Sequence, residues 1–135
     1  MTRKELKQLR CLNEEIADDE RRLYEIEKLS VSPPASNLTG VPNGATPVSE
    51  SRVERYAVEI ADLRSLIEEK RQRRILEQIR LERWIGDIPD SYLRRIFTLH
   101  YVDGLSWNQV AHRIKGTTAD AARMACKRYM DSAGG

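Results

Sequence analysis

The chain has 135 residues, a formal net charge of +2, and a composition in which 33% of residues are charged and 6% are aromatic. This predicts an all-α protein with one small domain and long solvated helices, and argues against a large globular core. No run approaches the roughly 20 apolar residues of a membrane span, the first residues lack the apolar block of a signal peptide, and the two cysteines are far apart, so we expect a cytoplasmic protein with reduced thiols.

The first segment predicts a long helix ending near Leu29. Thr2 and Glu5 have the spacing of a capping box, which satisfies free backbone N–H groups at a helix start. Apolar residues then recur three and four positions apart, with Asp19 as one polar interruption. They are Leu9, Leu12, Ile16, Leu23 and Ile26. This spacing is typical of a coiled-coil seam, and such a helix needs a partner to bury it.

A linker is predicted over residues 30–48. Four prolines, two glycines and the Asn43-Gly44 turn signal prevent a continuous helix there. Extended, this segment can span about 60 Å. It can therefore join parallel or antiparallel helices, and the predicted helical region 1–86 can pair within one chain or between two chains.

A second long helix is predicted from the capping box of Ser51 and Glu54 to Ile85, with Gly86 as its stop. Its first half carries a second seam, made of Val53, Tyr56, Ile60, Leu63 and Ile67. Lys70 and Arg74 interrupt this seam, and Ile75, Ile79 and Leu81 are expected to resume it with a shifted phase. A buried polar position such as Asp19 or Lys70 can set the register of a hairpin or of a dimer.

Residues 87–131 predict a separate three-helix domain, followed by a tail at 132–135. Asp90 is a candidate cap for a helix to about Tyr101. Ser106 and Gln109 form a third capping box, and Gly116 suits the left-handed position that closes a helix. The last helix is predicted over residues 118–130, with Thr117 or Thr118 as its N-cap.

The last two helices have apolar inner faces and a basic outer face. The residues expected to face inward are Val110, Ala111, Ile114, Ala122, Ala125, Cys126 and Tyr129. Small alanines allow close helix packing, and exposed cations suit the phosphates of DNA, so the pattern predicts a helix-turn-helix. An ordinary pair of helices with a solvated basic face is the alternative.

This region resembles the domain of bacterial sigma factors that reads the upstream promoter element. The matching parts are Leu99-His100-Tyr101, Asp103-Gly104-Leu105-Ser106, Gln109-Val110-Ala111 and the helix after Gly116. More closely, it is similar to small sigma-like regulators of phages and prophages of Gram-positive bacteria, the ArpU and RinA type. The motifs shared with them are Gly104-Leu105-Ser106-Trp107, Val110-Ala111 and Arg128-Tyr129. Ala122 replaces a larger residue of these families, and nothing resembles the promoter-melting sigma domain.

The resemblance implies a sequence-specific DNA-binding regulator of phage or prophage transcription in a bacterial host, working as a homodimer through the long helices or with RNA polymerase. Helix 118–130 is expected to enter the major groove of double-stranded DNA. The candidate DNA-binding residues are Lys115, Thr117, Thr118, Ala119, Arg123, Met124, Lys127 and Arg128. Two alternatives stay open: a DNA-packaging protein like a small terminase subunit, and a helical module that binds a host protein.

An enzyme is not expected. His100 has no accompanying nucleophile or paired carboxylate and is interpreted as a packed or surface histidine, while Trp107 is interpreted as a structural wedge against the third helix. No Cys/His cluster has metal-ligand spacing, so neither a metal nor another cofactor is predicted.

Overall fold

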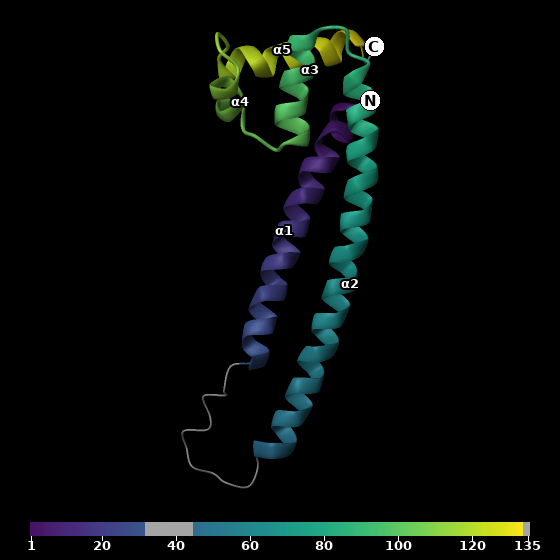
Figure 1. Ribbon diagram of the computed structural model, residues 1–135, viewed down its shortest axis with the longest axis vertical. Helices are drawn as coiled ribbons and strands as arrows, with labels where there is room; N and C mark the ends of the chain where they lie inside the picture. Colours follow the sequence, from purple (N-terminus) through teal and green to yellow (C-terminus); the bar gives the residue numbers. More distant parts are fainter. Residues whose placement is uncertain (32–44, 134–135) are drawn as a thin grey trace. The chain divides into compact units, whose positions relative to one another are not determined.

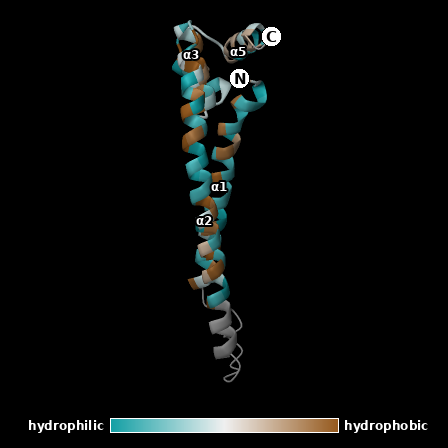
Figure 2. Ribbon diagram, turned by 90° about the vertical axis from the view of Figure 1, so that its right-hand side faces the viewer, coloured by the Kyte–Doolittle hydropathy of each residue, from teal (hydrophilic) through white to brown (hydrophobic). Residues whose placement is uncertain are grey.

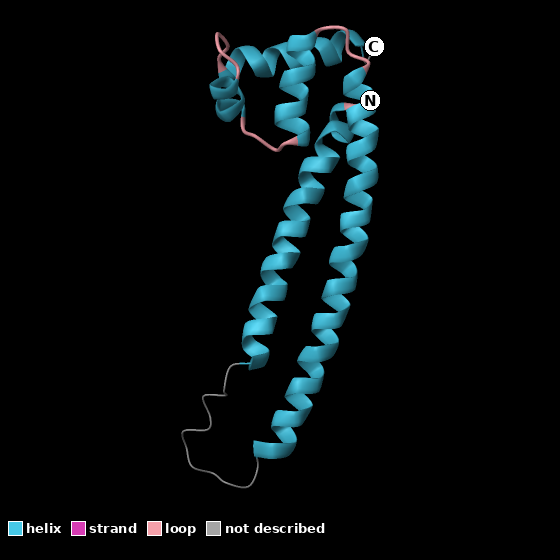
Figure 3. Ribbon diagram, viewed as in Figure 1, coloured by secondary structure: helices cyan, strands magenta, loops and turns pink. Residues whose placement is uncertain are grey.

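The computed structural model describes residues 1–31 and 45–133, with side chains of the second helix from residue 53 onward. All regular elements in these ranges are helical, which confirms the predicted all-α class (Figure 3). Two long helices, α1 (Arg3–Val31) and α2 (Ala45–Gly86), are followed by shorter elements (Figure 1). These are α3 (Ser91–Phe97), the π-helical turn η2 (Thr98–Val102), α4 (Trp107–Arg113) and α5 (Ala119–Ala133).

The chain divides into two compact units. One unit combines residues 1–14 with residues 72–135, and the other contains residues 15–71. Each long helix therefore contributes to both units. The core crosses the predicted boundary at residue 87, because the start of α1 and the end of α2 pack with the short helices.

Antiparallel pairing of α1 and α2 is evident from the ion pairs in the unit of residues 15–71. Lys70 donates to Asp19 at 2.5 Å, and Arg64 donates to Glu27 at 2.7 Å. Partners further along α1 thus lie earlier in α2. Within this unit the pairing is therefore antiparallel, one of the two arrangements that the linker length left open.

Asp19 is the polar centre of this seam. Only 3% of its surface is exposed, and its carboxylate accepts hydrogen bonds from Lys70 and, at 2.7 Å, from Arg22. The bond from Lys70, followed by that from Arg22, lowers the pKa of Asp19. Lys70 also lies 3.3 Å from Glu15. The two predicted interruptions of the seams are therefore partners of each other, and a buried charge pair of this kind fixes the register of two helices.

The other unit is built around Phe97, the only phenylalanine of the chain. Its ring contacts Trp84 and Tyr129 edge-on, with centroid distances of 5.3 and 5.8 Å, and stacks on Tyr101 at 5.7 Å. Buried apolar residues from five helices and from the turns after α2 and α4 complete this core. They are Leu6, Leu9, Leu81, Ile85, Ile88, Ile96, Val110, Ile114, Ala122 and Met130.

The predicted shift of the seam in α2 is wrong. Leu81 and Ile85 are buried, whereas Ile75 and Ile79 are 49% and 43% exposed. Buried Ile67 and buried Leu81 are two heptads apart, so the seam keeps its phase. The seam positions between them are occupied by polar residues such as Lys70 and Arg74. Figure 2 shows the resulting isolated apolar residues along both long helices.

The predicted start of α1 is observed, whereas the predicted start of α2 is not. The capping box of Thr2 and Glu5 is confirmed, with bonds of 2.6 and 3.1 Å. The box predicted at Ser51 is not a helix start, because α2 begins at Ala45. Pro47 is tolerated in this first turn, where backbone N–H groups have no acceptor within the helix. Most of the predicted linker, residues 32–44 with the Asn43-Gly44 signal, lies outside the described residues.

Removing the Asp19 carboxylate leaves Lys70 partly buried without its main partner. We expect Asp19→Ala to lower the free energy of unfolding by about 2–4 kcal/mol. Asp18→Ala is the matched control: this neighbouring aspartate is exposed and, among the described residues, paired only with Arg21, so its loss should cost at most about 1 kcal/mol. Urea denaturation of both variants measures the difference, and equal losses would contradict the assigned role of Asp19.

Candidate nucleic-acid interface

The starts of α3 and α4 follow the capping signals in the sequence. Asp90 caps α3 by accepting a hydrogen bond from the Tyr92 amide at 2.9 Å. Ser106 caps α4, and both bonds of its box with Gln109 are present, at 3.2 and 2.9 Å. These predictions are confirmed, and the caps fix where the chain enters each helix.

The turn between α4 and α5 is set by Gly116. Its φ of +83° lies in the left-handed region that favours glycine. Thr118 caps α5 by accepting from the Ala121 amide at 3.1 Å. The hydroxyl of Thr117 lies 2.6 Å from that of Tyr92, which ties the turn to α3.

The inner face of α5 contains Ala122, Cys126 and Met130, which are buried at 0, 2 and 7% exposure. The burial of Met130 follows from helical spacing after Ala122 and Cys126, although the inward face was predicted to end at Tyr129. Burial also raises the pKa of the Cys126 thiol to about 12. This thiol therefore stays protonated and packs as a small apolar group.

The candidate DNA-binding residues lie on or next to the outer face of this helix pair. Lys115, Thr118, Arg123, Lys127 and Arg128 are exposed. Within the described residues, neither Lys127 nor Arg128 has a hydrogen-bonding or ion-pairing partner, whereas Arg123 lies 3.7 Å from Asp120.

The other three candidate residues, Thr117, Ala119 and Met124, are half-buried. The hydroxyls of Thr117 and Thr118 both take part in bonds within the protein. Among the eight candidate residues, the polar side chains that remain available to a ligand are therefore mainly the cations.

His100 and Trp107 form a stacked aromatic pair beneath this surface. Their rings lie 3.7 Å apart at an angle of 14°. His100 is buried, and its Nδ1 lies 2.7 Å from the carbonyl oxygen of Leu105. With Nδ1 donating to that carbonyl, Nε2 accepts from Arg10 at 3.1 Å. Trp107 thus packs against the third helical segment, as the wedge interpretation predicted.

Burial is the main reason that the pKa of His100 falls to about 4, and the positive charges of Arg10 and Lys7 lower it further. The imidazole is therefore neutral at pH 7. It serves as a packing and hydrogen-bonding group with no charge of its own.

Two cations of α1 lie beside α5 and were missed by sequence reasoning. Arg3 forms an ion pair with Asp131, and Arg3 and Lys7 line a pocket together with Arg123 and Lys127. More than a hundred residues separate the two pairs of cations. No local pattern reveals such a contact, and the charges of α1 suggested a solvated face.

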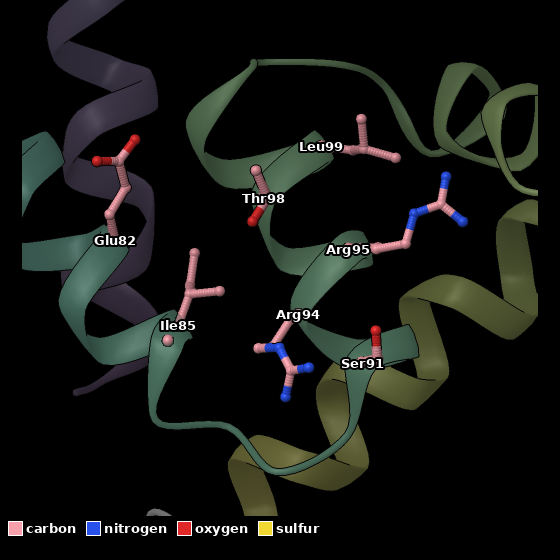
Figure 4. A pocket seen from close by; sticks show the side chains of 8 residues that line it. Glu82, Ile85, Ser91, Arg94, Arg95, Thr98 and Leu99 are labelled. Carbon is pink, nitrogen blue, oxygen red and sulfur yellow. The ribbon is translucent and has the colours of Figure 1, made fainter.

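A larger pocket, of about 440 Å³, lies between α2 and the α3–η2 segment. Ile85 and Leu99 supply its apolar surface, and Glu82 and Arg95 are among its polar residues (Figure 4). The guanidinium of Arg94 donates to the carbonyl oxygens of Ile88 and Pro89, so it stabilises the turn after α2.

No group of three or more His, Cys, Asp or Glu side chains within residues 1–31 and 53–133 could hold a metal ion. None of the described helices combines the length and apolar character needed to cross a membrane. Comparison with protein families, curated proteins and solved structures finds no significant match to this chain. The chemistry of the surface is therefore the basis for assigning a function.

The neutral state of buried His100 predicts a loss of stability in mild acid. The unfolded imidazole titrates near pH 6.5 and the folded one near pH 4. Between these values the unfolded state binds more protons, so the free energy of unfolding should fall as the pH drops, by at most about 3 kcal/mol.

Urea denaturation of the parent and of His100→Gln at pH 7, 5.5 and 4.5 measures this contribution. The carboxylates are common to both proteins, so the difference in pH dependence isolates His100. Parallel curves for the two proteins would contradict a buried neutral imidazole.

Proposed function

We propose that this protein is a DNA-binding regulator of phage or prophage transcription that inserts α5 into the major groove. The observation that supports the proposal is the helix pair itself: α4 and α5 each begin at a side-chain cap, are joined by the left-handed Gly116, and leave Lys127 and Arg128 without partners in the described part of the chain. A helix-turn-helix places its second helix in the groove with cations near the phosphates.

The charge on this helix pair is positive but small. The basic residues after Gly104 are Arg113, Lys115, Arg123, Lys127 and Arg128, and the acidic residues are Asp120 and Asp131. The excess is modest, and the whole chain carries only +2. Such a protein should bind DNA through a few placed contacts and with a shallow salt dependence.

Substitution of the unpartnered cations of α5 tests the proposal. We expect Lys127→Ala and Arg128→Ala each to weaken binding to duplex DNA and, where the side chain contacts a phosphate, to lower the slope of log affinity against log salt by about one unit. Arg83→Ala is the matched control, because this exposed arginine lies on α2 and removes the same charge. Fluorescence anisotropy with genomic and random duplexes provides the measurement. Parental affinity of both Lys127→Ala and Arg128→Ala would exclude α5 as the helix that enters the groove.

Binding to a protein partner is a second function that one observation favours. Leu76, Ile75 and Ile79 are 69, 49 and 43% exposed on one side of α2. Exposed apolar side chains grouped along a helix are typical of protein interaction sites. RNA polymerase is the partner implied by the sigma-like resemblance. A homodimer through the long helices is the other partner expected from the sequence, and these three residues offer it an apolar surface.

Purified bacterial RNA polymerase tests this second function. We expect Leu76→Asp to reduce binding of the protein to polymerase at least tenfold, because a charged group would have to be desolvated at the contact. DNA affinity should be unchanged, since Leu76 lies on α2. Sedimentation of the parent and of this variant separates the alternatives: a dimer that dissociates on substitution assigns the three residues to a second copy of the chain.

A further inference from the structure

Four cations from α1 and α5 surround a pocket of about 250 Å³. Arg3 and Lys7 lie one turn apart on α1, and Arg123 and Lys127 lie one turn apart on α5. Residues at this spacing share a face of their helix, so the two helices present these pairs to the same space. The stacked rings of His100 and Trp107 contribute to its surface.

The charged side chains that line the pocket are all basic. Among the residues that the structure describes, no carboxylate lines it, and Lys7 and Lys127 have no partner. The partners of Arg3 and Arg123 are Asp131 and Asp120, which have side-chain exposures of 57 and 91%. Exposed pairs of this kind contribute little and leave the arginines available. His100 is neutral, and the positive charge of Lys7 contributes to its lowered pKa.

An anion would relieve the mutual repulsion of these cations. A group that accepts several charge-assisted hydrogen bonds at once fits best, and phosphate offers the required oxygens. The pocket is smaller than the roughly 300–1,000 Å³ typical of sites for drug-sized ligands. Its size therefore suits one phosphate with its adjoining sugar, as found in a nucleic-acid backbone.

We propose that Arg3 and Lys7 of α1, together with Arg123 and Lys127 of α5, bind a backbone phosphate of the DNA whose groove α5 enters. This inference rests on the proposed DNA-binding function and assigns a DNA contact to the first turns of the N-terminal helix. Phosphates flank the groove on both sides, and flanking residues of a reader helix are the usual phosphate contacts. The α1 cations would increase the affinity for all sequences equally.

Lys7→Ala tests the proposal, with Lys4→Ala as its matched control. Both lysines are exposed on the first turns of α1, both changes remove one charge, and Lys4 does not line the pocket. Anisotropy titrations with genomic and random duplexes at several salt concentrations compare the full-length proteins. We expect Lys7→Ala to weaken binding about three- to tenfold on both duplexes and to lower the salt slope by about one unit. Lys4→Ala should remain within twofold of the parent, and Lys7→Arg should retain affinity.

A double variant examines whether Lys7 and Lys127 share one phosphate. Groups that contact a common partner are coupled, so the loss in Lys7→Ala/Lys127→Ala should be smaller than the product of the two single fold-losses. Strict multiplication of the single effects would place the two lysines on different phosphates and overturn the shared site. Circular dichroism at 222 nm checks that the variants keep their helical content.

The outcomes also separate this inference from the proposed function. The parent protein could bind DNA, with lower affinity in Lys127→Ala but equal affinity in Lys7→Ala and Lys4→Ala. That result would overturn the α1 contact and leave the proposed insertion of α5 into the groove intact. Absence of DNA binding by the parent would overturn both. ATP, titrated into a Trp84→Phe background with Trp107 fluorescence as the signal, probes a free phosphate compound. Tight ATP binding that depends on Lys7, without an effect of Lys7→Ala on DNA affinity, would assign the pocket to a free nucleotide and overturn the backbone contact.

Discussion

The unit of residues 1–14 and 72–135 depends on the packing of α1 into the same core as α4 and α5. Leu6 and Leu9 are 0 and 2% exposed and belong to one cluster with Phe97 and Val110. A three-helix domain with one phenylalanine has little apolar surface to bury, and small domains are marginally stable for that reason. Leucines from α1 and Leu81 and Ile85 from α2 supply the missing area. The first part of α1, up to Glu14, therefore belongs to the unit that would bind DNA.

Electrostatic interactions then fix how α1 and α2 align. In the unit that contains the α1 start, Glu5 accepts a hydrogen bond from Arg80 at 2.5 Å, and this bond is the largest cause of a Glu5 pKa near 2. In the unit of residues 15–71, Asp19 and Lys70 perform this role with little solvent access. Apolar seams tolerate a shift by a heptad, whereas a buried charge pair does not, because a shifted register would leave both charges unpaired.

Local features were predictable from the sequence because their determinants lie within four residues. The caps at Thr2, Asp90 and Ser106 and the left-handed Gly116 belong to this group. The phase of α2 was not predictable, since Ile75 and Leu81 are equally apolar and only the partner helix decides which one is buried. The proximity of Lys7 to Lys127 depends on tertiary packing over more than a hundred residues. Periodicity therefore identified the helix pair and most of the seams, although Val53 of the second seam is 55% exposed. It could not show that α1 meets α5.

The position of Lys7 between two buried leucines has an energetic consequence. Leu6 and Leu9 anchor the backbone of this turn in the core, so the backbone of Lys7 is held beside the pocket before any ligand arrives. A cation on a loop would lose backbone freedom on binding, at about 1–2 kcal/mol per residue ordered, whereas Lys7 loses only side-chain freedom. A DNA-binding surface with few cations would gain most from such an arrangement. The hydrophobic surface that stabilises the fold thus also determines which charges of the long helix face the pocket.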